Sequence, residues 1–359
     1  MHTYNVLGLM SGTSLDGLDM AYCQYRFVQQ CWEFEIVKTR QIAYTDTRRK
    51  ELAYAVTLPA VELLGLHHRY GDWLGGQVRQ FVVQEQLKID FVASHGHTVH
   101  HRPDLGITFQ AGCGQHLSNR CGLPVVCDFR SSDLALGGQG APLVPMGDRL
   151  LFGEYDFCLN IGGISNISFE DGSQRIAYDI GIANMLLNYL CRKIQQPFDP
   201  NGDIARSGTC NDELLQKLNA LPYYKSAYPK STGYEWFAKE IIPLAEASAD
   251  TVPNLLCTAV HHIAYTVALA LKLHSVGRFM PKVLVSGGGA FNTFLIDSIR
   301  NYLQDRAEII IPDSQIIDYK EALIFGFLGV LRERKQVNTL HSVTGAKADS
   351  CGGIFYFPQ

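Results

Sequence analysis

The chain has 359 residues, of which 47% are hydrophobic and 18% are charged, and its formal net charge is -4. This length suits about two domains with buried cores. The composition excludes a disordered chain, which combines low hydrophobicity with high charge, and the acidic balance argues against a nucleic-acid-binding protein. The ten cysteines form no C-x-x-C pair and the N-terminus lacks the pattern of a signal peptide, so we expect reduced thiols and a cytoplasmic protein.

The first half of the sequence predicts a strand, a turn rich in glycine and hydroxyl groups, and two more strands. The third of these strands alternates Trp32, Phe34 and Ile36 with acidic residues, as a half-buried strand does. The predicted elements are strands over 3–10, 18–27 and 32–44, a helical region over 59–87 interrupted near Gly75-Gly76, and strands over 90–94 and 125–129.

The second half repeats this order of strand, glycine turn, strand and strand. Two related halves that each open with an antiparallel hairpin are a stronger signal than either hairpin alone. Strands that alternate with helices further along the chain indicate an α/β protein. The elements are strands over 156–161, 167–170, 175–180, 282–286 and 308–311, helices over 184–193, 253–274, 290–303 and 320–332, and an irregular insertion over 197–235.

The two glycine turns are candidate phosphate-binding loops. Glycines let backbone N–H groups point outward around an anion, and Thr13 and Ser14 add hydroxyl donors. Asp16 and Asp19 carry carboxylates of the kind that hold Mg²⁺. Each turn alone is also compatible with an ordinary hairpin, because Gly, Ser and Asp are common turn residues. The first loop comprises Gly12, Thr13, Ser14, Leu15, Asp16, Gly17, Leu18 and Asp19, and the second contains Gly162, Gly163 and Asn166.

Three further features would suit a ligand. Gly287, Gly288 and Gly289 lie between a predicted strand and helix, where free amides bind an anion or a nucleotide, although a compact turn is the alternative. Asp179 ends a predicted strand and would suit a general base or a helix cap. Arg130 follows another strand and would bind a carboxylate with two nitrogens, or form a surface ion pair.

Several common sites are excluded or disfavoured. The sequence contains no P-loop, no G-x-G-x-x-G at a strand-to-helix turn and no G-x-S-x-G. The histidines at 95, 97, 100 and 101 have no cysteine at a matching spacing, so hydrogen-bonding loop histidines are favoured over zinc, and no metal ligand is assigned. The apolar stretch 258–274 carries three histidines and a lysine, which indicates a buried helix rather than a membrane span.

Together these segments resemble the 1,6-anhydro-N-acetylmuramic acid kinases of bacterial peptidoglycan recycling, nearly from end to end. The family belongs to the actin-like superfamily, so the resemblance implies an α/β protein of two ribonuclease-H-like domains around a central nucleotide cleft. We expect domains over 1–150 and 151–359, with the last helix and tail free to pack back on the first. The matching segments are G-L-M-S-G-T-S-L-D-G-L-D (8–19), S-H-G (94–96), H-R-P (101–103), D-F-R-S-S-D-L-A-L-G-G-Q-G-A-P-L-V-P (128–145), N-I-G-G-I-S-N (160–166), S-G-G-G-A-F-N (286–292), E-A-L (321–323) and S-V-T-G-A (342–346).

The resemblance implies an enzyme that uses ATP and Mg²⁺. Water attacks the anomeric carbon and opens the 1,6-anhydro bridge, and the freed O6 takes the γ-phosphoryl group to give N-acetylmuramic acid 6-phosphate. By position, Asp179 matches the general base, the turns 12–19 and 162–163 match the two phosphate loops, and 287–289 match the nucleoside side. The implied substrate-binding residues are Arg130, Asn184 and Glu321.

The sequence departs from the family pattern at two positions. Ile182 replaces the proline of D-x-G-P-x-N, and His97 replaces the glutamine of H-G-Q-T. Asp179, Gly181 and Asn184 are retained, so an enzyme is still expected. Two alternatives stay open, a simple sugar kinase and an ATP- and sugar-binding protein with little catalysis. We expect a small-molecule sugar substrate and neither a nucleic-acid nor a membrane partner, and the sequence leaves a homodimer open.

Overall fold

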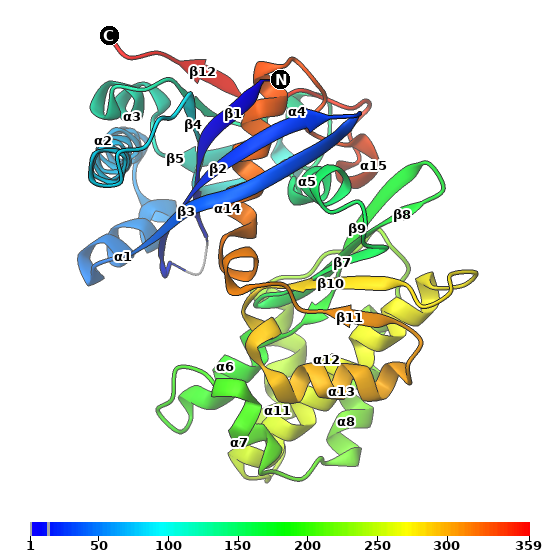
Figure 1. Ribbon diagram of the computed structural model, residues 1–359. Coiled ribbons are helices and arrows are strands. Elements are labelled where there is room, and N and C mark those ends of the chain that lie inside the picture. The colour runs from blue at the N-terminus through cyan, green and yellow to red at the C-terminus, as the bar shows by residue number, and fades with distance from the viewer. Residues whose placement is uncertain (1, 13–14) are drawn as a thin grey trace. The chain divides into compact units, whose positions relative to one another are not determined.

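The computed structural model describes residues 2–12 and 15–359. The chain divides into two compact units (Figure 1), which are described separately below. Unit 1 comprises Met1–Phe152 and Tyr319–Gln359, and unit 2 comprises Gly153–Asp318. The residues from 319 onward therefore belong to unit 1, although they follow unit 2 in the sequence.

Unit 1 is built on a seven-stranded sheet of order β12-β6-β4-β1-β2-β3, with β5 paired to β4. The first three strands are antiparallel neighbours, whereas β4 runs parallel to β1 and β6 runs parallel to β4. The edge strand β3 exposes every second residue in its first half, as the alternation in its sequence predicts. The strands are β1 (Thr3–Ser11), β2 (Gly17–Val28), β3 (Cys31–Ala43), β4 (Phe91–Arg102), β5 (Ile107–Ala111), β6 (Val125–Cys127) and β12 (Ile354–Tyr356).

Unit 2 is built on a five-stranded sheet of order β11-β10-β7-β8-β9. Here β7, β8 and β9 are antiparallel, and β10 runs parallel to both β7 and β11. Each unit thus places its first strand between its own antiparallel hairpin and a pair of parallel strands, which confirms the predicted duplication of a ribonuclease-H-like fold. The strands are β7 (Phe157–Ile161), β8 (Ile164–Asp171), β9 (Gln174–Ile182), β10 (Lys282–Ser286) and β11 (Glu308–Ile310).

Helices cover both sheets, and the core of unit 2 is centred on α12. This helix packs against β9, α6, α8 and α13. It is long and apolar enough to cross a membrane, but 78% of its most apolar window is buried, as expected of a core helix. The helices are α1 (Asp46–Ala53), α2 (Ala60–Gln84), α3 (Gly114–Cys121), α4 (Ser131–Ala135), α5 (Val144–Leu151), α6 (Asn184–Arg192), α7 (Asp203–Arg206), α8 (Asp212–Asn219), α9 (Pro222–Lys225), α10 (Tyr234–Trp236), α11 (Ile242–Glu246), α12 (Val252–His274), α13 (Thr293–Leu303), α14 (Ser314–Glu333) and α15 (His341–Thr344).

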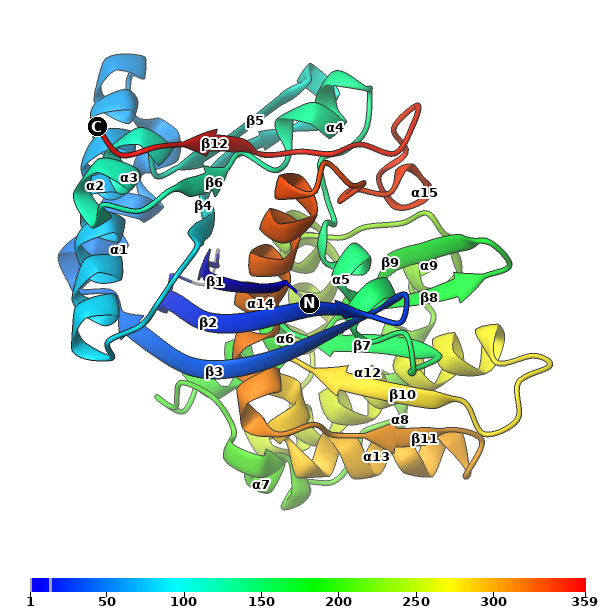
Figure 2. The same ribbon diagram turned by 45° about the horizontal axis from the view of Figure 1, so that its top comes forward.

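The predicted interruption at Gly75-Gly76 is wrong, because α2 continues through it. A β-carbon at Gly75 would lie only 2.6 Å from Cβ of Arg120 and 2.7 Å from the carbonyl oxygen of Leu117. The absence of a side chain therefore lets α3 lie against α2, and the two helices run side by side in Figures 1 and 2. Here glycine serves helix packing rather than a break in the helix.

Two other predictions also differ from the structure. The four histidines at 95–101 lie on β4, which continues to Arg102, and not in a loop after a short strand. Pairing with β5 continues the strand, since His97 to Arg102 form its register with β5. The insertion 197–235 is not irregular throughout, because it contains the short helices α7, α8 and α9.

Helix α14 is held against the sheet of unit 1 by a close approach to β1. A β-carbon at Gly8 would collide with the carbonyl oxygen of Ala322, so only glycine fits there. The hydroxyl of Tyr25 on β2 donates a hydrogen bond to the carbonyl oxygen of Leu323 at 2.6 Å. These contacts fix the position of Glu321, the residue before Ala322, relative to the first hairpin.

Candidate functional site

The first glycine hairpin joins β1 to β2 in unit 1. Thr13 and Ser14, two of its predicted ligand-binding residues, lie outside the described residues. On either side of them, the amide of Leu15 donates to the carbonyl oxygen of Gly12 at 3.3 Å. Leu15 has a φ of 60°, so the chain turns through a left-handed conformation before β2 begins.

The second half of this hairpin is fixed by β3. A β-carbon at Gly17 would collide with the carbonyl oxygen of Ile42, so glycine allows β2 to begin close to its neighbour. The side chain of Leu18 is buried in the core, whereas the carboxylate of Asp19 accepts a hydrogen bond from Gln41 at 3.0 Å. Asp16 is exposed. The two carboxylates of the predicted loop thus lie outside the core.

His97, where the sequence departs from the pattern of the family that it resembles, takes part in a buried network at the end of β1. Its Nδ1 lies 3.2 Å from the hydroxyl of Ser11. That hydroxyl also accepts from Tyr44 at 2.6 Å, and Tyr44 lies 2.6 Å from the hydroxyl of Tyr70. Burial lowers the pKa of His97 to about 4. A neutral imidazole therefore completes a network that fixes the start of the first hairpin.

Arg130 is positioned by β4 and by a glycine loop. Its Nε and one terminal nitrogen lie 3.1 Å and 2.8 Å from Nε2 of His95, and its other terminal nitrogen donates to the carbonyl oxygen of Gly140 at 2.6 Å. Burial lowers the pKa of Arg130 to about 10, although the nearby carboxylate of Glu321 opposes this shift. The guanidinium remains charged at neutral pH and is held in one orientation.

Glu321 lies on α14, close to both Arg130 and Asp19. The pKa of Glu321 is raised, mainly because the surrounding protein desolvates its carboxylate. The charge of Arg130 opposes this shift, and the charge of Asp19 adds to it. Unit 1 thus brings together two of the predicted substrate-binding residues and one predicted phosphate-loop carboxylate.

The loop that holds Arg130 is organised by Asp133, which is fully buried. Its carboxylate accepts hydrogen bonds from the amide of Gly140 and the hydroxyl of Thr344, each at 2.7 Å. A β-carbon at Gly138 would collide with the same carboxylate. The carboxylate of Asp133 therefore joins the segments 128–145 and 342–346.

In unit 2, the second glycine turn packs on the start of α6. The backbone amides of Ala183 and Met185 donate to the carbonyl oxygen of Gly163 at 2.9 Å and 3.1 Å. The backbone amide of Asn184 donates to the carbonyl oxygen of Gly162 at 3.1 Å. A β-carbon at Gly163 would meet nothing nearer than 3.8 Å. Space is therefore left on the outer side of this turn.

The loop after β10 lies against the same turn. Gly287 has a φ of 79°, and a β-carbon there would lie 2.5 Å from Oδ1 of Asn160. The side-chain amide of Asn184 donates to the carbonyl oxygen of Ile161 at 3.1 Å and lies near Gly288. Asn184 and Gly288 both line a cavity of about 310 Å³. The other lining residues are Leu187, Asn188, Phe198, Asp199, Pro200, Asn201, Phe291 and Asn292.

Asp179 lies on β9 opposite Asn166 of β8. Its Oδ2 accepts a hydrogen bond from the amide of Thr232 at 3.1 Å, and among the described residues this is the only hydrogen bond to its carboxylate. Desolvation raises the pKa of Asp179, and the hydrogen bond from Thr232 partly offsets the shift. One carboxylate oxygen is therefore available to act on a ligand.

The surroundings of Asp179 come from the insertion that sequence patterns leave unassigned. The hydroxyl of Tyr223 donates a hydrogen bond to the carbonyl oxygen of Asp179 at 2.7 Å. The backbone amide of Asp179 in turn donates to the carbonyl oxygen of Lys230 at 3.1 Å. A β-carbon at Gly181 would collide with the ring of Tyr224. These contacts come from Tyr223, Tyr224, Lys230 and Thr232, which together cover Asp179. Their spacing in the sequence shows no periodicity that would predict their contact with β9.

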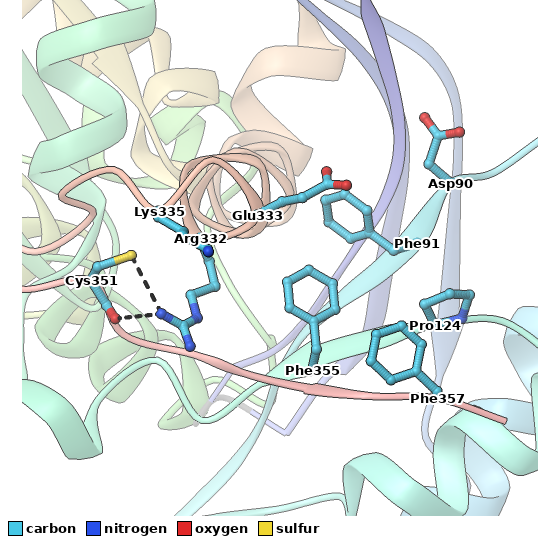
Figure 3. A pocket seen from close by; sticks show the side chains of 9 residues that line it. All are labelled: Asp90, Phe91, Pro124, Arg332, Glu333, Lys335, Cys351, Phe355 and Phe357. Atoms are coloured by element: carbon cyan, nitrogen blue, oxygen red, sulfur yellow. Dashed lines mark hydrogen bonds between the residues drawn. The ribbon is translucent and has the colours of Figure 1, made fainter.

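A cavity of about 440 Å³ in unit 1 lies apart from these groups. Figure 3 shows the rings of Phe91 and Phe355 packed edge to face there, with centroids 5.5 Å apart, and Arg332 turned toward the carbonyl oxygen of Cys351 at 3.4 Å. None of the predicted site residues that the structure describes lines this cavity. A cavity by itself therefore does not identify the functional site.

The predicted residues gather in two groups, one in each unit. In unit 1, Asp19, Arg130 and Glu321 lie close together. In unit 2, the turn 162–163, Asn184 and the loop 287–289 form one cluster, while Asp179 and Asn166 are neighbours across β8 and β9. All ten cysteines are free thiols, as expected.

Comparisons with known proteins agree with the sequence resemblance. The family model described as "Anhydro-N-acetylmuramic acid kinase" matches residues 4–358. A protein of that name from Shewanella sp. (strain MR-4) is 34% identical over 97% of this chain and 98% of its own length. Another, from Bacillus cereus (strain ZK / E33L), is 29% identical over 98% of this chain and 99% of its own length.

Solved structures show weaker similarity. The activator of 2-hydroxyisocaproyl-CoA dehydratase from Clostridium difficile with bound ADPNP has a TM-score of 0.42 at 14% identity, covering 92% of this chain and 97% of its own. A ROK family glucokinase from Streptomyces griseus in complex with glucose and AMPPNP has a TM-score of 0.39 at 15% identity, covering 90% and 98%. The match of the family model over residues 4–358 is decisive, and the chain belongs to the anhydro-N-acetylmuramic acid kinase family.

Proposed function

We propose that the protein uses ATP to convert 1,6-anhydro-N-acetylmuramic acid into N-acetylmuramic acid 6-phosphate, a step in the recycling of cell-wall sugars. The observation that carries the proposal is the carboxylate of Asp179, which has one hydrogen-bonded oxygen, one available oxygen and a raised pKa. Membership of the family supplies the substrate class.

Asp179 suits the role of a general base. A carboxylate whose pKa is raised above its usual value removes a proton from water more readily. Its backbone is held on both sides, since Tyr223 binds its carbonyl oxygen and Lys230 accepts from its amide. The water would attack the anomeric carbon while the bridging oxygen leaves from the opposite face, so the reaction inverts that carbon.

The groups assigned to ATP in unit 2 fit a nucleotide. The outer side of Gly163 has room for a phosphate next to the backbone, because a β-carbon there would have no neighbour within 3.7 Å. Gly288 and Asn184 line the adjoining cavity of about 310 Å³, which offers space to a nucleoside. We assign the triphosphate to the turn 162–163 and the nucleoside to the loop 287–289.

The groups assigned to the sugar and to Mg²⁺ are in unit 1. The oriented guanidinium of Arg130 suits the lactyl carboxylate of the sugar, because Arg binds carboxylates with two parallel hydrogen bonds. Asp16 and Asp19 carry oxygen donors of the type that Mg²⁺ prefers, and neither lies in the core. Mg²⁺ bound with ATP neutralises charge on the transferred phosphoryl group.

The test is ADP formation with the anhydro sugar, followed by the same reaction in ¹⁸O-water. We expect ADP only when the sugar is present, label at the anomeric hydroxyl, and no label in the phosphate ester. An unbridged amino sugar serves as the matched control acceptor. A product that keeps its anhydro bridge would favour a simple sugar kinase, and label in the phosphate would contradict direct transfer of the phosphoryl group to O6. ATP and sugar binding without ADP formation would favour a binding protein.

A further inference from the structure

We propose that His68, Cys113 and His116 of unit 1 form a binding site for a zinc-like divalent cation that joins α2 to the beginning of α3. His68 lies on α2, Cys113 immediately precedes α3, and His116 lies in its first turn. One ligand atom from each lies within 4.8 Å of the other two. The site uses none of the residues assigned above to the nucleotide or the sugar.

The three side chains are close to the geometry that a metal requires. Zinc bonds of about 2.0–2.3 Å to nitrogen and sulfur place tetrahedral ligand atoms roughly 3.4–3.6 Å apart. The rings of His68 and His116 already stack, with centroids 4.5 Å apart and planes 12° from parallel. His68 is exposed, so its side chain can move by the remaining ångström or so without disturbing the core.

The backbone holds Cys113 next to α2. Its amide donates to the carbonyl oxygen of His67 at 3.0 Å, and the amide of Gly112 donates to Nδ1 of His67 at 3.1 Å. A β-carbon at Gly71 would lie 2.7 Å from the carbonyl oxygen of Cys113 and 3.2 Å from Cβ of His116. Glycine at 71 therefore lets α2 approach the two ligands that begin α3.

A carboxylate orients one of the ligands. Nδ1 of His116 lies 3.1 Å from Oδ1 of Asp72. A carboxylate accepts hydrogen bonds, so Nδ1 carries the proton and Nε2 of His116 is left to bind a metal. Metal-ligating histidines usually donate their second ring nitrogen to a carboxylate or a carbonyl in this way. Asp72 is therefore a positioning residue for the site.

The donor set selects the metal class. One thiolate and two imidazoles suit Zn²⁺ and its chemical relatives, whereas Mg²⁺ prefers oxygen donors. Binding exchanges the thiol proton of Cys113 for a sulfur–metal bond, and the proton is released to solvent. Three protein ligands leave the fourth tetrahedral position to water.

The first experiment titrates Co²⁺ into the full chain, stripped of metal and free of nucleotide, in a buffer with a reductant that contains no thiol. We expect one equivalent to produce a thiolate-to-cobalt charge-transfer band together with visible bands of tetrahedral intensity, and Zn²⁺ to displace the cobalt. Co²⁺ held only by oxygen donors gives no charge-transfer band, so the Mg²⁺-binding carboxylates cannot imitate the result. The absence of the band in folded protein would overturn the proposal.

Variants identify the ligands. Cys113→Ser should abolish the charge-transfer band, and His68→Gln, at an exposed position where folding is not at risk, should weaken Zn²⁺ binding at least tenfold. Asp72→Asn should weaken it about 10–100-fold, the range for residues that orient a ligand. The matched controls are Cys31→Ser, at an exposed cysteine, and His100→Gln on β4. Zn²⁺ affinity unchanged in His68→Gln, or a band that survives Cys113→Ser, would refute the site.

Discussion

Arg130 directs two of its nitrogens to a single nitrogen of His95, at 3.1 Å and 2.8 Å. A guanidinium only donates, so Nε2 of His95 is the unprotonated acceptor, and Nδ1 carries the proton that points to the carbonyl oxygen of Gly96 at 2.9 Å. Burial, and secondarily the charge of Arg130, hold the pKa of His95 well below its usual value. His95 is therefore a neutral positioning residue for Arg130.

Replacing this acceptor should weaken sugar binding. In His95→Phe the ring volume is retained but the donors of Arg130 lose their partner, which costs about 1–3 kcal/mol for a buried group. We expect KM for the anhydro sugar to rise roughly tenfold or more while KM for ATP stays unchanged, and His95→Gln to restore most of the affinity. His100→Phe on the same strand is the control. Equal changes in both KM values would indicate a general structural defect instead.

Asp179→Asn should retain the fold and ATP binding but lose about 10²–10⁴-fold in kcat, the usual contribution of a general base. The amide of Thr232 can still donate to the asparagine oxygen, so the local structure is preserved. Because the pKa of Asp179 is raised, wild-type activity should fall on acidification with a midpoint above the ordinary 3.8 of an aspartate.

Steady-state rates of the wild type over a pH series provide the measurement for Asp179. Asp171→Asn, near the far end of β8, is the matched control and should behave as wild type. A rate for Asp179→Asn within threefold of the wild type would remove Asp179 from the mechanism.

Two glycines of unit 2 should respond differently to a side chain. Gly163→Val meets open space and should leave the melting temperature of the free protein unchanged, while blocking the approach of phosphate. Gly287→Val forces a branched residue to a φ of 79° and against Asn160, so it should destabilise the protein itself.

Thermal unfolding with and without ATP separates the two cases. ATP at a hundredfold excess over Kd should stabilise the wild type by about 2.7 kcal/mol. We expect no ATP effect in Gly163→Val, and a lower melting temperature of the free protein in Gly287→Val. If ATP raises the melting temperature of Gly163→Val as much as that of the wild type, the turn has a purely structural role.

Buried neutral histidines should make the fold sensitive to acid. Burial lowers the pKa of His262 to about 3 and that of His97 to about 4. The unfolded chain takes up these protons near pH 6.5, so between about pH 6.5 and pH 4 it binds more protons than the folded chain. The free energy of unfolding should therefore fall as the pH falls through this range.

His262→Gln tests the contribution of one such residue. Nδ1 of His262 lies 2.7 Å from Oδ1 of Asn219, a bond that a glutamine amide can replace. Denaturant titrations from pH 7 to pH 4 give the free energy of unfolding at each pH. We expect this free energy to change with pH by about 1.4 kcal/mol per pH unit less in His262→Gln than in the wild type. A pH dependence of the free energy of unfolding in His262→Gln equal to that of the wild type would contradict the assignment.

The sequence predicts the two hairpins because their first strands are short apolar runs and their turns are marked by glycine. It also identifies Arg130 and Glu321 through the family resemblance, and the structure brings these residues close together. The prediction fails at Gly75, where glycine serves the packing of α3, because helix propensity carries no information about a helix that begins at Gly114.

The cover over Asp179 and the cluster around Cys113 could not be predicted for a similar reason. Thr232 meets Asp179 through a backbone amide, and any residue except proline has such a group. His68 and Cys113 are brought together by a glycine at 71, whose effect depends on which helix packs there. Contacts of this kind depend on tertiary structure and leave no periodic pattern in the sequence.

The collision that any side chain at Gly8 would have with Ala322 has a consequence for synthesis on the ribosome. β1 leaves the ribosome among the first residues, yet the helix that packs on it, and the edge strand β12, arrive near the end of translation. Unit 2 is continuous in the chain and can fold while unit 1 is still incomplete. We therefore expect unit 2 to complete its fold before unit 1, the reverse of the usual order in which the N-terminal domain folds first. A nascent chain stopped before residue 319 would then expose the unfinished core of unit 1 to chaperones.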